Sequence, residues 1–69
     1  DQGARKYRRS IYISKDIDAG EIVTKEHLTV IRPGLGLAPQ FYDAILGKKL
    51  RHSQVKGVPT RWDLFTDES

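Results

Sequence analysis

The chain has 69 residues, no cysteine and a formal net charge of +3. This length limits it to one small domain, which buries only about 60% of the surface that its unfolded chain exposes. The absence of cysteine excludes disulfides and thiolate metal sites, and no apolar run approaches the ~20 residues of a transmembrane helix. Since the first residues include neither an initiator methionine nor an apolar signal segment, we expect a fragment of a longer cytoplasmic protein.

The positive charge is concentrated near the N-terminus, at Arg5, Lys6, Arg8 and Arg9. Such a cluster is typical either of a phosphate-binding patch or of a solvated linker that leaves a preceding domain. We favour the linker, because the cluster lacks the aromatic ladder that single-strand nucleic-acid binders use. The sequence therefore predicts no nucleic-acid partner and no membrane partner.

Ordered structure is expected to begin near Arg9. Ile11 and Ile13 alternate with a tyrosine and a serine, which predicts a strand with both isoleucines pointing inward. Residues 16–20, Asp-Ile-Asp-Ala-Gly, predict a turn, because aspartate supplies a side-chain acceptor and glycine can adopt a positive φ. Ile22 and Val23 then form a very short extended piece.

Thr24 is placed to cap a single helical turn that ends at residue 27 or 28. Residues 28–32 predict a second strand, because β-branched side chains occupy its middle. Pro33 ends this strand, since a residue before proline is held in an extended conformation. The glycines at positions 34 and 36 permit either a close backbone approach or a positive φ.

A helix of about two turns is predicted from Pro39 to Leu46, because apolar residues recur there at helical spacing. Gly47 is its expected C-terminal stop. Farther along, Lys56 and Gly57 predict a turn. Thr60 with an acid three residues later predicts a capping box, and Leu64 and Phe65 close the core.

Gly20 and Gly57 each begin the same order of features: a turn glycine, a short strand, a capped single turn and an apolar anchor. This echo predicts two units related by a pseudo-two-fold axis. The alternative is coincidence, which four matching positions do not exclude. The fold class expected is mostly β with short 3-10 and α turns. The core residues expected are Ile11, Ile13, Ile17, Ile22, Val30, Leu37, Ile45, Leu46, Val55 and Leu64.

Short stretches along the chain resemble one known family. They are Arg9-Ser10-Ile11-Tyr12, Asp16-Ile17-Asp18-Ala19-Gly20-Glu21, Ile31-Arg32-Pro33-Gly34-Leu35-Gly36-Leu37, Leu46-Gly47-Lys48-Lys49, Gly57-Val58-Pro59 and Trp62-Asp63-Leu64. Together they resemble the C-terminal antifreeze-like (SAF) domain of bacterial sialic acid synthases, which make N-acetylneuraminic, legionaminic or pseudaminic acid. The resemblance implies a compact β-clip fold over residues 9–66, preceded by a linker over 1–8 and followed by a tail over 67–69.

The resemblance also implies a function. The family's enzymes carry an N-terminal (β/α)₈ barrel that condenses phosphoenolpyruvate with an N-acetylated amino sugar such as N-acetylmannosamine. The barrel uses a divalent metal, manganese or magnesium; no cofactor is expected in the SAF domain. These transferases are domain-swapped homodimers of carbohydrate biosynthesis, in which each SAF domain covers the partner subunit's active site and donates an arginine. That arginine matches Arg32, and the isolated domain is expected to be a monomer.

Arg32 also attracts attention on its own chemistry. Its guanidinium presents five donors in a fixed fork, and a strand end followed by Pro33, Gly34, Leu35 and Gly36 would give it a rigid base. The fork suits a sugar's acetamido carbonyl or hydroxyls. The alternative is an arginine that is merely solvated or pairs with Asp63 or Glu26. Leu35 and its glycine neighbours are weaker candidates for the same contact, because a leucine more often packs in a core.

Other functions are weighed against this one. A free-standing binding module for a glycan or ice would share the fold of fish type III antifreeze proteins. Lys15, Asp16 and Glu21 occupy positions that match part of the flat ice-binding surface there, and their hydrated charges count against ice binding. A purely structural dimerisation domain is the third interpretation, since fold alone does not determine function.

Catalysis by the chain itself is not expected. His27 and His52 lack metal-ligand spacing, and no Gly-x-Ser-x-Gly nucleophile motif is present. The Gly-x-Gly at positions 34–36 lacks the third glycine of a dinucleotide fingerprint. The sequence therefore predicts no catalytic residue and no metal site within the domain.

Overall fold

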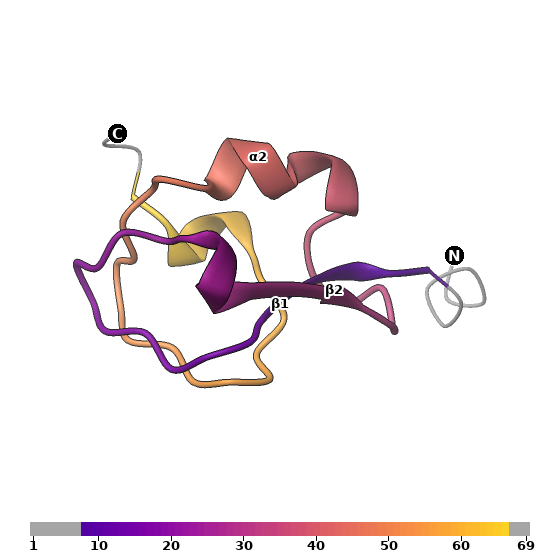
Figure 1. Ribbon diagram of the computed structural model, residues 1–69, viewed down its shortest axis with the longest axis horizontal. Helices are drawn as coiled ribbons and strands as arrows, with labels where there is room; N and C mark the ends of the chain where they lie inside the picture. The colour runs from indigo at the N-terminus through magenta and orange to yellow at the C-terminus, as the bar shows by residue number, and fades with distance from the viewer. Residues whose placement is uncertain (1–7, 67–69) are drawn as a thin grey trace.

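Residues 8–66 are described by the computed structural model of this chain, which Figure 1 shows as a ribbon. Apart from Arg8, the predicted linker over 1–8 and the predicted tail over 67–69 lie outside the described residues. Within the described part, strands and isolated β-bridges are joined by helical segments of three or four residues. A mostly β domain with short 3-10 and α turns was the prediction, and it is confirmed.

The regular sheet is an antiparallel pair of strands, β1 (Ser10–Ile13) and β2 (Leu28–Ile31). Pairing starts with Ser10 opposite Ile31 and ends with Ile13 opposite Leu28. Every residue of β1 is buried, so the predicted alternation of the strand does not appear as alternating exposure. The reason is that bridges from two distant segments, at residues 37 and 59, cover β1 as well.

The helical segments form where local signals predict them. In η1 (Lys25–His27), Thr24 is the N-cap, and its backbone N–H donates to Nδ1 of His27 over 3.0 Å. The imidazole takes the place that a glutamate has in a capping box. The predicted longer helix is a 3-10 turn, η2 (Pro39–Phe41), that continues into α2 (Tyr42–Ile45). In Figure 1 these two segments lie above the β1–β2 pair.

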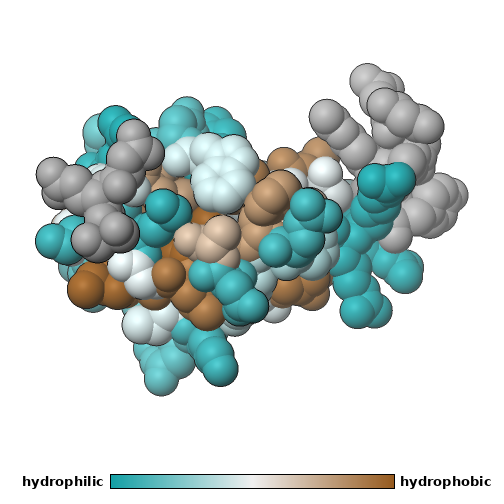
Figure 2. All heavy atoms as spheres, turned by 90° about the horizontal axis from the view of Figure 1, so that it is seen from above, coloured by the Kyte–Doolittle hydropathy of each residue, from teal (hydrophilic) through white to brown (hydrophobic). Residues whose placement is uncertain are grey.

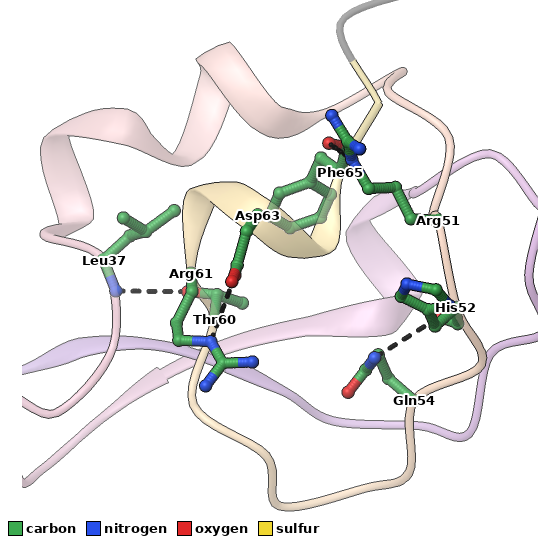
Figure 3. Close-up of polar contacts among 8 residues, drawn as sticks. All are labelled: Leu37, Arg51, His52, Gln54, Thr60, Arg61, Asp63 and Phe65. Carbon is green, nitrogen blue, oxygen red and sulfur yellow. Dashed lines mark hydrogen bonds and ion pairs between the residues drawn. The ribbon is translucent and has the colours of Figure 1, made fainter.

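The last helical turn, η3 (Trp62–Leu64), corrects one prediction. Thr60 does not cap this turn, because its side chain makes no cap hydrogen bond and the N-cap is the following residue. Instead, the buried Thr60 hydroxyl donates to the Ile11 carbonyl at 2.7 Å. It also accepts the Leu37 N–H at 3.2 Å (Figure 3). Buried backbone groups need such partners, so tertiary pairing outweighs local capping here.

The core forms between the β1–β2 pair and the loops and turns that cover it. Ile22 and Val55 were predicted in this core but are 52% and 60% exposed. Val23, the next residue after Ile22, is buried in its place. The buried residues of the core cluster are Ile11, Ile13, Ile17, Val23, Leu28, Ile45, Leu50, Leu64 and Phe65, and the expected Val30, Leu37 and Leu46 pack against them half-buried.

The two turn glycines of the sequence echo share a backbone conformation. Gly20 has a φ of 85° and Gly57 a φ of 97°. Each is followed by a 3-10 turn and then by a buried apolar residue, Leu28 after η1 and Phe65 after η3. The local structure agrees with the echo, whereas the pseudo-two-fold relation between the units stays a prediction.

Candidate functional site

Arg32 directly follows the last residue of β2, and both it and Pro33 are exposed. The peptide bond that joins them is cis. Among residues 8–66, the Arg32 guanidinium has no hydrogen-bond or ion-pair partner. Glu26 and Asp63, which were the alternative partners, pair with other basic residues at 3.6 and 3.1 Å. All five guanidinium donors therefore remain available to a ligand.

The loop after Arg32 is tied to β1 by side-chain hydrogen bonds. The hydroxyls of Ser10 and Tyr12 both donate to the Pro33 carbonyl, at 3.0 and 2.8 Å. Ser10 Oγ also accepts the Gly36 N–H at 2.9 Å. The carbonyl next to Arg32 is thus held by two side chains of a fully packed strand. Such anchoring limits the movement of the arginine's backbone, although the side chain itself lies in solvent.

Gly36 explains why this loop can lie so close to β1. A Cβ atom built at Gly36 would overlap the Ile11 carbonyl oxygen and lie 3.0 Å from the Thr60 nitrogen. It would also lie 3.2 Å from Ser10 Oγ. The sequence left open whether this glycine permits a close backbone approach or a positive φ. The structure shows the close approach, since Gly36 is not among the glycines with positive φ.

An open hollow of about 500 Å³ lies beside Arg32 and is lined by Arg9, Val30, Ile31 and Arg32. Ile31 is 46% exposed, and Leu35 on the neighbouring loop is 57% exposed. We expected Leu35 to pack in the core, and its exposure shows that this expectation was wrong. Seen from above in Figure 2, apolar side chains emerge elsewhere on the surface too, between hydrophilic ones.

The predicted site residues therefore occupy one end of the β1–β2 pair. Arg32, Pro33 and Leu35 are exposed there, while Gly34 and Gly36 are half-buried. The loop brings them together as neighbours in sequence, and no residue from a distant segment was predicted to join them. A contact of any of them with a sugar stays a prediction.

Arg9 is the site residue that sequence reasoning missed. It was counted in the N-terminal basic cluster, which we interpreted as solvated, yet it lines the same hollow as Arg32. The strand pairing offers a signal in retrospect. Because Ser10 pairs with Ile31, Arg9 and Arg32 occupy the next position on each strand. Only the register reveals this, and the sequence alone does not define it.

Three titratable side chains farther from the hollow make local structural contacts. Nδ1 of His27 caps η1, as described above, and Asp16 accepts the Lys56 N–H at 2.9 Å. Glu21 accepts the Asp18 N–H at 2.7 Å. Within residues 8–66, no three His, Cys, Asp or Glu side chains gather closely enough to hold a metal ion.

None of the helices in the described part is both long and apolar enough to span a bilayer. The longest of them is a single turn.

The C-terminal end of η3 is held by a side-chain hydrogen bond. Arg51 Nε donates to the Phe65 carbonyl at 3.0 Å, so the last buried residue is joined to the segment at residue 51 (Figure 3).

Comparisons with known proteins agree with this fold. The family model of the SAF domain matches residues 8–66. Among solved structures, the spore coat polysaccharide biosynthesis protein spsE from Bacillus subtilis superposes with a TM-score of 0.79. The superposition covers 97% of this chain and 20% of that protein, at 24% sequence identity.

The curated relatives are synthases of acidic sugars. Pseudaminic acid synthase of Campylobacter jejuni is 51% identical over 45 residues, which are 65% of this chain and 13% of that protein. Pseudaminic acid synthase of Helicobacter pylori is 47% identical over the same length and shares. N,N'-diacetyllegionaminic acid synthase of Legionella pneumophila is 36% identical over 56 residues, 81% of this chain and 16% of that protein. The match thus spans about a seventh of each relative's length.

Proposed function

This chain belongs to the SAF domain family, and from that premise we propose that it is the C-terminal domain of a nonulosonic acid synthase. The enzyme would condense phosphoenolpyruvate with an N-acetylated amino sugar. Support comes from the similarity to pseudaminic and legionaminic acid synthases. The proposal assigns the chemical step to a (β/α)₈ barrel in the remaining part of the protein.

The proposed role of the domain is to cover the active site of the partner subunit in a cytoplasmic homodimer and to bind the sugar through Arg32. The observation that carries this role is the exposed guanidinium of Arg32, which lacks a partner within residues 8–66 and extends from an anchored loop. Its donors suit the acetamido carbonyl and hydroxyls of the sugar. The exposed apolar surfaces of Pro33 and Leu35 would lie next to the acetamido methyl group.

The same geometry explains why the domain would bind rather than catalyse. The hydroxyls of Ser10 and Tyr12 are used in holding Pro33. The carboxylates described above hold backbone N–H groups or basic side chains. The proposal assigns the divalent metal, manganese or magnesium, to the barrel. This domain would orient the sugar and exclude water as the partner's site closes.

A condensation assay on the full-length protein tests the proposal. Phosphoenolpyruvate, a divalent metal and a set of N-acetylated amino sugars would be supplied to the wild type and to Arg32→Ala. Losing a hydrogen bond to a charged group in a water-excluded site costs about 1.5–3 kcal/mol. We therefore expect KM for the sugar to rise by about 10- to 100-fold, with KM for phosphoenolpyruvate much less changed.

Lys25→Ala provides a matched control, because it removes one exposed cation from η1 at the opposite end of β2. It should leave both KM values unchanged. Full activity with indifference to Arg32 would make the domain a structural or dimerisation element. Absence of condensation with every sugar would reject the synthase and favour a free-standing binding module.

A further inference from the structure

Two arginines lie near the end of the β1–β2 pair, where both line the open hollow. Ser10 and Ile31 form the terminal residue pair of the two strands. Arg9 directly precedes Ser10, and Arg32 directly follows Ile31. Residues opposite one another in an antiparallel pair have Cβ atoms about 4.5–5.5 Å apart, and these two are one step beyond. Both side chains line the same open hollow, so they face a common space.

Nothing in the described part of the chain neutralises this pair. Neither guanidinium takes part in an ion pair or hydrogen bond within residues 8–66, although acidic side chains elsewhere in that range do pair with lysine or arginine. Like charges facing one another across two strands are destabilising. An anion that binds between them would remove this repulsion and satisfy the free donors at the same time.

We propose that Arg9 and Arg32 together bind an anionic group, phosphate or carboxylate, in this hollow. Arg9 is then a binding residue, whereas the sequence alone counted it only in the solvated basic cluster. A phosphate has three terminal oxygens and about two charges, which match two guanidinium forks, whereas a carboxylate is satisfied by one. The pair therefore prefers phosphate. Val30 and Ile31, the remaining lining residues, provide an apolar wall for the carbon skeleton of an organic phosphate.

This inference goes beyond the proposed function and does not depend on it. In the proposed function Arg32 contacts an uncharged group of a sugar, and Arg9 has no role. A failed condensation assay would leave the anion site standing. Conversely, a chain that binds no anion would still be able to present Arg32 to a sugar.

Nuclear magnetic resonance titration of the ¹⁵N-labelled chain tests the site. Inorganic phosphate, methyl phosphate and acetate are added separately at constant ionic strength. We expect saturable shifts at the backbone amides of residues 9 and 30–32 and at the Nε–H groups of Arg9 and Arg32. Both phosphates should bind more tightly than acetate, which also distinguishes the two sources of negative charge.

Charge-removing variants complete the test. Arg9→Gln and Arg32→Gln should each weaken phosphate binding by about fivefold, the effect expected for one solvent-exposed ion pair. Lys25→Gln changes the net charge equally and should have no effect. The proposal is overturned if the shifts do not saturate or are spread evenly over all basic residues. It is also overturned if Arg9→Gln behaves like Lys25→Gln, since Arg32 would then bind alone.

Discussion

Replacing Gly36 with alanine should remove a large part of the stability of this domain. The added methyl group would overlap the Ile11 carbonyl oxygen and press on the Thr60 nitrogen at 3.0 Å. These two backbone atoms belong to residues joined by a 3.1 Å hydrogen bond, so neither moves away without breaking it. Overpacking costs about 1–3 kcal/mol and a lost hydrogen bond about 1 kcal/mol. We expect about 3 kcal/mol in all.

Such a loss is large, because a chain of this length has only about 3–10 kcal/mol of stability. The midpoint of thermal unfolding, followed by far-ultraviolet circular dichroism, should fall by about 10–25 °C. Gly57→Ala is the control: its φ is 97° but its Cβ would meet open space, so only backbone strain of about 1–2 kcal/mol is added. A Gly36→Ala variant within about 0.5 kcal/mol of the wild type would refute the close-approach explanation.

Further substitutions test the hydrogen bonds and the core. Tyr12→Phe removes the hydroxyl that holds the Pro33 carbonyl, and urea titration should show a loss of about 0.5–1.5 kcal/mol in the free energy of unfolding. Thr60→Val removes the hydroxyl that bonds the buried Ile11 carbonyl and the half-buried Leu37 N–H, so thermal unfolding should reveal a loss of about 2–3 kcal/mol. Ile45→Ala should lower stability by about 2–5 kcal/mol in urea, whereas the exposed Val55, changed to alanine, should leave the urea midpoint unchanged.

Features with a local physical cause were predictable from the sequence. Thr24 before η1, Pro39 at the start of η2 and the positive φ of Gly57 all follow from interactions within a few residues. The β-branched runs that pair as β1 and β2 were equally clear. Since these elements make up most of the regular structure, the fold class was predictable, and the resemblance of short motifs supplied the arrangement.

Features decided by distant segments were not predictable in this way. Thr60 had a local capping role available but bonds to Ile11, which is 49 residues away. Ile22 and Val23 are equally apolar by sequence, and the one that becomes buried depends on which side of the chain the core lies. The site shows the same division: Arg32 and its loop could be named from the sequence, whereas Arg9 joins them only through strand register.

The scattered β-bridges have a consequence for how the domain folds and opens. They join Tyr12 to Pro59, Ile17 to Gln54 and Ile22 to Lys49, so little of this hydrogen bonding can form before most of the chain has collapsed. Contact patterns dominated by such long-range pairs fold slowly for their size. None of these isolated bridges is expected to be stable without the rest of the fold. The protected amides should therefore exchange with solvent together, through opening of the whole domain.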